Sequence, residues 1–296
     1  MAIYSYLQGG LGNQLFQYAI ARALSERYQV DFALDRSWFA IPQVGTTPRQ
    51  FQLELLNIPE ISYFNSPFPK KPSRLQRFLQ NTISSGPIIH YQKNAFDFDP
   101  TLFNLSNIKN RDLYLSGYWQ GFPYIETIRP ILQKDFELRA STSPYYQPYL
   151  QQIAESESVM LHIRRGDYID SPSAAQFHSV LPLDYYLKAM SSIQSAKTQP
   201  HFYIFSDDLP WAKAALPTNL KMTFVENSLQ EDATAQELQL MRACKHHIIA
   251  NSSLSWWGAW LKNNTDGLVF APNRWIRDDK QNLADLLPPQ WQKLPA

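Results

Sequence analysis

Two adjacent arginines stand in the segment His162-Ile-Arg-Arg-Gly-Asp-Tyr168, directly after an apolar run. The planar guanidinium groups of Arg164 and Arg165 match phosphate oxygens, to which each can donate two parallel hydrogen bonds. A diphosphate leaving group needs such a cation, because positive charge stabilises the anion that forms as it departs. Asp167 is placed to hold one guanidinium, and His162 is either a core histidine or a contact to a nucleotide base. The alternative is a surface Arg–Asp pair without a ligand.

A glycine-rich turn, Gly9-Gly-Leu-Gly-Asn-Gln-Leu-Phe-Gln17, follows the first apolar run. It lacks the Lys-Ser/Thr pair of a Walker A loop, and Leu15 occupies the place of the third glycine of a dinucleotide fingerprint. Bare backbone at Gly10 and Gly12, where a helix begins, offers N–H groups to an anionic or polar ligand. Asn13 adds an amide donor and acceptor. The alternative is a tight turn whose glycines only supply unusual backbone angles.

A third motif, Asn251-Ser-Ser-Leu-Ser-Trp-Trp257, again follows an apolar run. Ser252 and Ser253 are typical of helix starts, where hydroxyls and the N–H groups of the first turn form an anion site. The tryptophans that follow are expected to pack in the core. Two arginines at one strand end and a hydroxyl-lined helix start at another suit a diphosphate between them, as in a nucleotide-sugar donor.

Paired carboxylates, Asp207 and Asp208, follow a further apolar run. Such a pair can bind a divalent metal, but adjacent residues of an extended chain point in opposite directions. An aspartate at the start of the next helix is also favoured by the helix dipole. We therefore expect a helix cap here rather than a metal site.

These motifs share a position, because each follows an expected strand. In the second half strands are expected at 159–163, 201–205, 222–225, 247–250 and 268–271, with helices at 183–193, 211–216, 235–244 and 254–261. This alternation predicts an α/β fold with a parallel sheet covered on both faces, where ligands bind beyond the carboxyl ends of the strands. The first half is less regular. A strand at 3–7, a helix over 15–24 and a strand running into a turn at 112–120 are expected there, and the stretch 41–100 is rich in proline.

Composition narrows the function further. The 296 residues carry a net charge of +1, which gives no basic footprint for nucleic acid. One cysteine excludes a disulfide framework and a multi-cysteine zinc site. The start has no basic region of a signal peptide, and no run approaches the roughly 20 apolar residues of a membrane span. We expect a cytoplasmic protein, with peripheral membrane contact left open.

Taken together, the motifs resemble the α-1,2-fucosyltransferases of glycosyltransferase family eleven, from about residue 4 to about residue 275. The segment Gly117-Tyr-Trp-Gln120 resembles a further element of that family. The resemblance implies a GT-B architecture, in which two Rossmann-like domains face each other across a cleft. Residues 1–145 would form the acceptor-side domain and residues 146–296 the domain that binds GDP-fucose.

The same resemblance implies the reaction and the roles of residues. L-Fucose would pass, with inversion, from GDP-β-L-fucose to the 2-hydroxyl of a β-galactoside acceptor in glycan or O-antigen biosynthesis, without a metal. Arg164 would contact the β-phosphate, and Asn13 would position the reacting groups. His162 would lie near the nucleotide, and Ser252 and Ser253 near the diphosphate. The base that takes the acceptor proton stays unassigned among Asp35, Glu54, Asp97 and Asp99.

Three rival functions use different features of the chain. A fucosyltransferase of another linkage, such as α-1,3, shares the arginine motif. A nucleotide-dependent oxidoreductase is suggested by Gly10-Leu-Gly12, but the missing third glycine counts against it. A carbohydrate-binding module fits the aromatic content of 14%, yet such a module needs no pair of arginines for phosphate.

Overall fold

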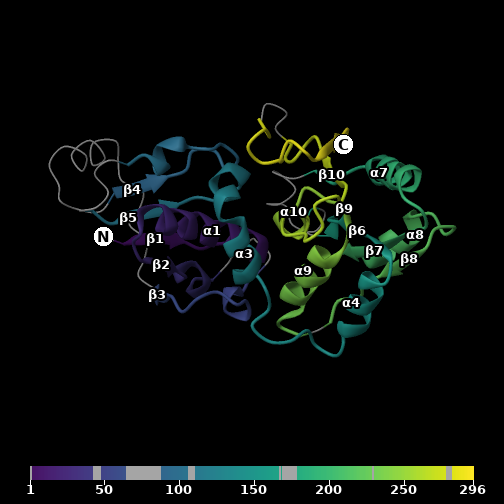
Figure 1. Cartoon of the computed structure of the whole chain (residues 1–296), viewed down its shortest axis with the longest axis horizontal. Coiled ribbons are helices and arrows are strands. Elements are labelled where there is room, and N and C mark those ends of the chain that lie inside the picture. Colours follow the sequence, from purple (N-terminus) through teal and green to yellow (C-terminus); the bar gives the residue numbers. More distant parts are fainter. Residues whose placement is uncertain are drawn as a thin grey trace.

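The computed structural model describes residues 2–42, 48–64, 88–105, 111–166, 168, 179–228, 230–277 and 282–296. Figure 1 shows two α/β units side by side, the first in purple and blue and the second in green and yellow. Each unit is built on its own parallel sheet. Among the helices of these residues, none is both long enough and apolar enough to cross a bilayer.

The first sheet has five strands in the order β3-β2-β1-β5-β4. Its strands are β1 (Ile3–Tyr6), β2 (Phe32–Asp35), β3 (Ser62–Phe64), β4 (Ile88–Tyr91) and β5 (Leu113–Ser116), and all of them pair in parallel. The long helix α1 (Leu11–Tyr28) follows β1 directly. Short 3-10 helices are η1 (Ser37–Ala40), η2 (Leu53–Leu55), η3 (Pro100–Phe103), η5 (Phe122–Tyr124) and η6 (Glu126–Ile128). The expected strands near residues 3 and 112 and the first helix are confirmed.

The second sheet has six strands in the order β11-β10-β9-β6-β7-β8. They are β6 (Glu157–Ile163), β7 (Pro200–Ser206), β8 (Met222–Phe224), β9 (His246–Ile248), β10 (Val269–Pro272) and β11 (Gln292–Leu294). The helices of this half are α4 (Gln147–Ala154), α7 (Leu183–Ala196), α8 (Leu209–Ala215), α9 (Ala233–Ala243) and α10 (Ser253–Trp260), whereas α3 (Arg129–Asp135) lies beside α1 in the first unit (Figure 1). Every strand and helix expected between residues 159 and 271 is therefore confirmed, and the fold is α/β as predicted.

Strand β6 is apolar throughout because its side chains point alternately into two cores, one on each face of the sheet. Met160 belongs to the large core between the units, whereas Val159 and Leu161 belong to a second core on the opposite face of the sheet. Both faces are covered, as is usual for parallel sheets.

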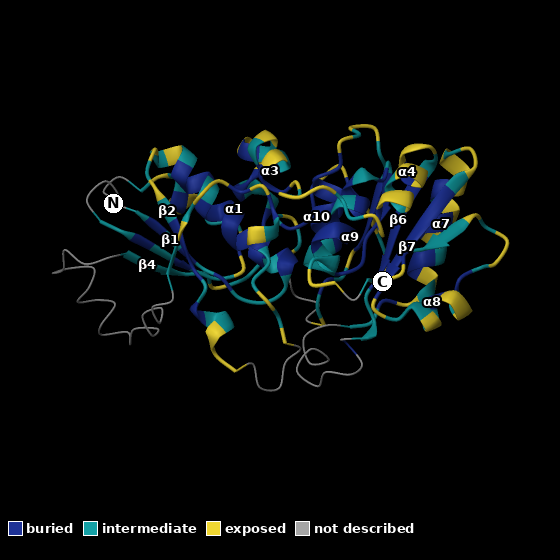
Figure 2. Ribbon diagram, turned by 90° about the horizontal axis from the view of Figure 1, so that it is seen from below, coloured by how far each residue is buried: buried dark blue, intermediate teal, exposed yellow. Residues whose placement is uncertain are grey.

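The two units share the larger core, and α10 lies at its centre. Phe16 of α1 packs against Trp256 and Trp257 with ring centroids 4.7 Å away in each case, and Phe136 lies 5.1 Å from Trp257. Figure 2 shows this buried, dark-blue region running from α1 to α10. The expectation that these tryptophans pack in the core is confirmed.

The C-terminal segment returns to the first unit. The backbone N–H of Phe122 donates to the Asp285 carbonyl at 2.8 Å, and that of Phe98 donates to the Asp285 carboxylate at 3.0 Å. The expected boundary between residues 145 and 146 lies between the two sheets, just before α4, and stays a prediction.

Candidate functional site

The arginine motif lies where β6 ends, beside the end of β7. These strands pair in register, with His162 opposite Phe205 and Ile163 opposite Ser206, so the residues after each strand come together. The Nε atom of Arg164 lies 3.2 Å from Oδ2 of Asp207. The Nε atom of Arg165 lies 3.2 Å from Oδ2 of Asp208. Two aspartates therefore hold the two guanidinium groups.

Asp208 has a second role as the N-cap of α8. Its Oδ1 atom accepts a hydrogen bond from the backbone N–H of Trp211 at 3.1 Å, so the expected cap is confirmed. The Arg165 guanidinium also lies over the Trp211 ring, 4.8 Å from its centroid. Asp167, which we expected to hold a guanidinium, lies outside the described residues.

His162 is buried on β6, but its hydrogen bonding is incomplete. Its Nδ1 atom has no hydrogen-bond partner, which a core histidine would normally have. Burial and the nearby Arg164 cation lower the pKa of His162 to about 3. The imidazole is therefore neutral near pH 7 and offers an unused polar atom next to the arginines.

A buried carboxyl on α9 also belongs to this region. Burial raises the pKa of Glu237 to about 7, and the Arg164 cation acts in the opposite direction. Glu237 is not among the site residues predicted from the sequence. Its burial could have been inferred from the sequence, because helical spacing places Glu237 on the same face as the apolar residues Leu240 and Met241. All three are buried.

The glycine turn meets the start of α10. A Cβ atom on Gly12 would lie 2.5 Å from the backbone nitrogen of Leu254 and 2.6 Å from Oγ of Ser253. The indole N–H of Trp257 donates to the Gly12 carbonyl at 3.0 Å. Gly12 therefore brings α1 into close contact with the hydroxyl-rich motif. Ser252 occupies the N-cap position of α10, and its side chain makes no capping hydrogen bond.

Asn13 is fixed by contacts on two sides. Gly9 has φ of 81°, and a Cβ atom there would lie 2.7 Å from Nδ2 of Asn13. Glycine at position 9 thus allows the turn and makes room for the amide. On the other side, Nε2 of Gln120 donates to Oδ1 of Asn13 at 2.8 Å, which leaves the Asn13 amide group with a defined orientation.

Neighbouring strand ends assemble these parts into one site. Strand β9, which precedes Ser252, pairs with β6, and the Tyr168 hydroxyl donates to the Asn251 carbonyl at 2.9 Å. Contact between Gly12 and Ser253 brings the glycine turn to the same place. The predicted site residues, Asp167 excepted, thus lie at three neighbouring places: the end of β6 with the two arginines that follow it, the start of α1 with Gly10, and the start of α10 with Ser252. The described residues contain no group of three or more His, Cys, Asp or Glu side chains that could hold a metal.

Comparisons with known proteins point to one family. The model of glycosyl transferase family 11 matches residues 76–294. The O-antigen biosynthesis glycosyltransferase WbnK of Escherichia coli is 34% identical, over 95% of this chain and 97% of that protein. An alpha-1,2-colitosyltransferase of Escherichia coli is 29% identical, over 99% and 98%. The bovine galactoside 2-alpha-L-fucosyltransferase SEC1 is 24% identical, over 86% and 62%.

A solved structure shares the fold at low sequence identity. Fucosyltransferase NodZ from Bradyrhizobium aligns with a TM-score of 0.50 and 12% identity, over 88% of this chain and 92% of that chain. The expected GT-B architecture of two Rossmann-like units is confirmed.

Proposed function

The chain belongs to glycosyl transferase family 11, and from this premise we propose that it transfers L-fucose from GDP-β-L-fucose to the 2-hydroxyl of a β-galactoside, with inversion, in glycan or O-antigen biosynthesis. The names of the bovine and bacterial relatives support the sugar, the linkage and the pathway. The observation that carries the proposal is the pair Arg164 and Arg165, held by two aspartates beside a hydroxyl-rich helix start.

In the proposed reaction the acceptor oxygen attacks C1 of fucose from the side opposite the nucleotide. The bond between C1 and the β-phosphate oxygen breaks, the acceptor hydroxyl passes its proton to a carboxylate base or to water, and β-linked fucose becomes α-linked. Negative charge accumulates on the departing GDP. The Arg164 guanidinium offsets that charge, because its planar donors match phosphate oxygens. The hydroxyls of Ser252 and Ser253 and the N–H groups of the α10 first turn add donors nearby.

No metal is needed in this scheme. Asp207 and Asp208, the pair that could have bound one, are each committed to an arginine. The fixed guanidinium groups supply the positive charge that a divalent ion supplies in other transferases. We propose metal-independent transfer on this ground.

His162 and Glu237 are proposed to contact the nucleotide base. His162 ends β6 two residues before Arg164 and has an unpartnered Nδ1 atom, and Glu237 is a buried carboxyl on α9. Guanine carries acceptors at N7 and O6 and an amino donor at N2. The imidazole N–H of His162 can donate to an acceptor of guanine, and the carboxyl of Glu237 can accept from the amino group at N2. These two hydrogen bonds would select guanine over other nucleotide bases.

Colitose is the second candidate for the transferred sugar. It is fucose without the 3-hydroxyl, and the colitosyltransferase aligns with nearly the whole chain. The phosphate site described above would serve either donor equally. Competition between GDP-fucose and GDP-colitose for one acceptor decides between them, and we expect the larger kcat/KM for GDP-fucose.

One incubation tests the function as a whole. The enzyme is mixed with GDP-fucose and a panel of β-galactosides, with and without EDTA, and the products are analysed by mass and linkage. We expect α-1,2-fucosylated product at the same rate in both arms. An α-1,3 product would assign the other linkage, and loss of product in EDTA would restore a metal role for Asp207 and Asp208.

A thermal shift titration separates the remaining rivals. GDP-fucose should raise Tm, whereas NAD(P)H should not. The opposite result would favour an oxidoreductase, and stabilisation by glycans without any response to GDP would favour a binding module. We propose a cytoplasmic location, where the buried thiol of Cys244 stays reduced, and cell fractionation tests it together with membrane contact.

A further inference from the structure

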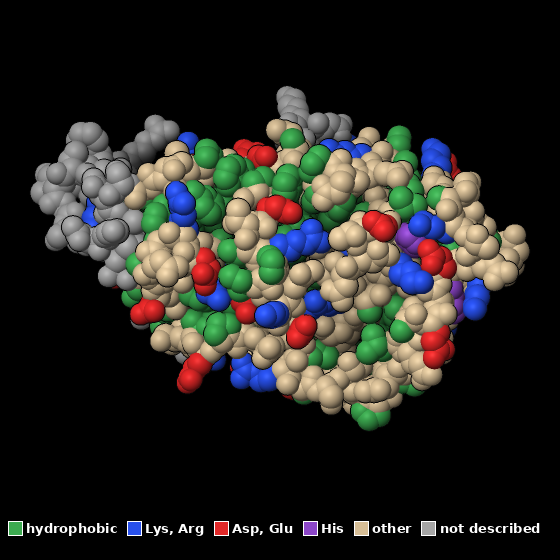
Figure 3. Space-filling model, in the orientation of Figure 1, with side chains coloured by type: hydrophobic (Ala, Val, Ile, Leu, Met, Phe, Trp, Pro, Cys, Tyr) green, Lys and Arg blue, Asp and Glu red, His purple; other side chains and the backbone are tan. Residues whose placement is uncertain are grey.

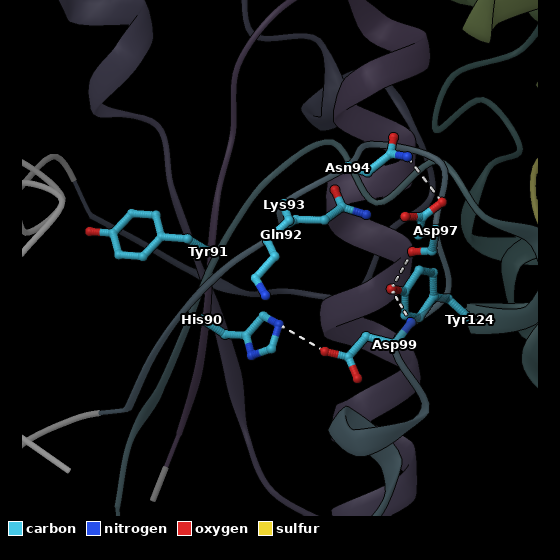
Figure 4. A pocket seen from close by; sticks show the side chains of 8 residues that line it. All are labelled: His90, Tyr91, Gln92, Lys93, Asn94, Asp97, Asp99 and Tyr124. Atoms are coloured by element: carbon cyan, nitrogen blue, oxygen red, sulfur yellow. Dashed lines mark hydrogen bonds and ion pairs between the residues drawn. The ribbon is translucent and has the colours of Figure 1, made fainter. Parts of the chain in front are cut away.

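A pocket of about 290 Å³ lies beside the edge strand β4, separate from the donor site. It is lined by His90, Tyr91, Gln92, Lys93, Asn94, Asp97, Asp99 and Tyr124. Figure 4 shows His90 and Asp99 facing each other, with Asn94 next to Asp97 and the Tyr91 ring turned away from the rest. This volume is close to the lower limit of small-ligand pockets, about 300 Å³.

We propose that this pocket binds a neutral sugar residue of the acceptor, adjacent to the galactose that receives fucose. What is inferred is the place of this second sugar, at the end of β4 and in the segment that follows it. The inference rests on the proposed glycosyl transfer and extends it to a subsite on the acceptor side.

The polar groups of the pocket suit sugar hydroxyls. Nε2 of His90 lies 3.2 Å from Oδ2 of Asp99. Burial lowers the pKa of His90, so the ring is neutral near pH 7, its Nε2–H donates to Asp99, and Nδ1 is an acceptor for a hydroxyl. Nδ2 of Asn94 donates to Oδ1 of Asp97 at 3.0 Å. Paired acceptors and donors of this kind, held in place by one another, fix the orientation of a ligand.

The charges of the pocket favour a neutral sugar. Two carboxylates, Asp97 and Asp99, line it together with one cation, Lys93, while His90 is neutral. A sialic or uronic acid would bring its own carboxylate next to those of the pocket. Like charges at such short range are unfavourable, which excludes acidic residues from this position of the acceptor.

The segment Tyr118–Gln120 joins the pocket to Asn13 of the donor site, with hydrogen bonds at each of its two ends. Oε1 of Gln92 accepts hydrogen bonds from the backbone N–H groups of Tyr118 at 3.0 Å and Trp119 at 2.7 Å. The next residue, Gln120, donates to Asn13. Strand β4 lies two strands from β1, which corresponds to about 10 Å at the usual strand spacing. A single galactose beside Asn13 therefore leaves the pocket to the neighbouring sugar.

The backbone is strained at Trp119, between the pocket and Asn13. Trp119 has φ of 55°, a left-handed conformation that is unusual for a bulky residue. Its ring is fully buried, and its Nε1 atom has no hydrogen-bond partner. Such strain persists where surrounding contacts impose it, and it concentrates at ligand sites. One contact at this residue is the hydrogen bond from the Trp119 backbone N–H to Oε1 of Gln92, and Gln92 lines the pocket.

Acceptor-length kinetics test the proposal. For the wild type we expect kcat/KM at least tenfold higher with lactose or a longer neutral β-galactoside than with methyl β-galactoside. His90→Ala and Asn94→Ala should raise KM for the longer acceptor at least tenfold, and leave KM for methyl β-galactoside and for GDP-fucose within twofold. Ser192→Ala, on α7, is the matched control and should change none of these constants.

Two results would overturn the proposal. One is an equal loss of activity with short and long acceptors, which would place the pocket residues in catalysis or in folding. The other is no change with either acceptor. Circular dichroism on each variant identifies a folding defect. Saturation-transfer NMR of lactose with the enzyme, without any donor, tests the pocket separately from the identity of the transferred sugar. In that experiment the His90→Ala variant should lose the signal of the glucose ring of lactose while the galactose ring keeps its signal, and an unchanged glucose signal would reject the subsite.

Discussion

A single carboxylate positions both arginines: Oδ2 of Asp207 lies 3.2 Å from Nε of Arg164, and its Oδ1 accepts the backbone N–H of Arg165 at 2.8 Å. The contact crosses from the end of β6 to the end of β7, so it forms only when these strands pair. It leaves the orientation of the Arg164 guanidinium determined before any phosphate binds. Preorganised charge of this kind lowers the cost of stabilising a leaving group.

Asp207→Asn should therefore lower kcat by about 100-fold, a loss typical of a misplaced reacting group. The asparagine retains the size of the side chain but not its charge, so the Arg164 guanidinium loses its fixed orientation. Steady-state kinetics with GDP-fucose give the value. Asp208→Asn is the comparison, since it affects Arg165 and the α8 cap instead. Equal kcat values for wild type and Asp207→Asn would contradict the positioning role.

Gly12→Ala should destabilise the contact between the two units. The added Cβ atom would lie 2.5 Å from the Leu254 backbone nitrogen, and overpacking of this type costs about 1–3 kcal/mol. Tm should fall by at least about 2 °C, as measured by calorimetry. Gly10→Ala is the matched control, because its Cβ atom would meet nothing nearer than Arg49 at 3.7 Å. Equal Tm values for the two variants would show that the close approach at Gly12 is not needed.

Glu237 should make stability depend on pH. Burial raises the pKa of its carboxyl from 4.5 to about 7, so between these values the folded chain holds a proton that the unfolded chain has released. Stability from this group is complete below about pH 4.5 and declines as pH rises through about 7. Glu237→Gln removes the effect.

The free energy of unfolding of Glu237→Gln, relative to wild type, should increase from pH 5 to pH 8 by up to about 3 kcal/mol, at about 1.4 kcal/mol per pKa unit. Denaturant titrations at both pH values measure this difference. A difference that stays constant with pH would mean that the carboxyl titrates normally.

The inner strands of the second sheet could be predicted from sequence because they are buried on both faces, whereas the short edge strand β11, which is largely exposed, was not predicted. Strands β6 and β7 read as continuous apolar runs, and both are buried over nearly their whole length. Strands β3 and β4 are three and four residues long and only partly buried. They carry no apolar pattern that distinguishes them from a loop, so the sequence did not predict them.

Site residues that directly follow a predicted strand were found from the sequence. Residues that reach the site only through tertiary contacts were missed. Arg164 and Ser253 each follow a predicted strand. The pairing of Arg164 with Asp207 depends on the register between β6 and β7, which no local pattern encodes. Glu237 lies within an ordinary helix, and the His90–Asp99 pair joins two places in the irregular stretch 41–100. Contacts of this kind depend on the tertiary fold.

The most direct measurement of the central claim is kcat of Arg164→Ala and Arg164→Lys for transfer from GDP-fucose. If the guanidinium stabilises the departing diphosphate, Arg164→Ala should lose at least about 100- to 1,000-fold in kcat, with Tm unchanged. Arg164→Lys should recover little, since an ammonium group cannot replace a planar fork. Transfer by Arg164→Ala at the wild-type rate would contradict the account.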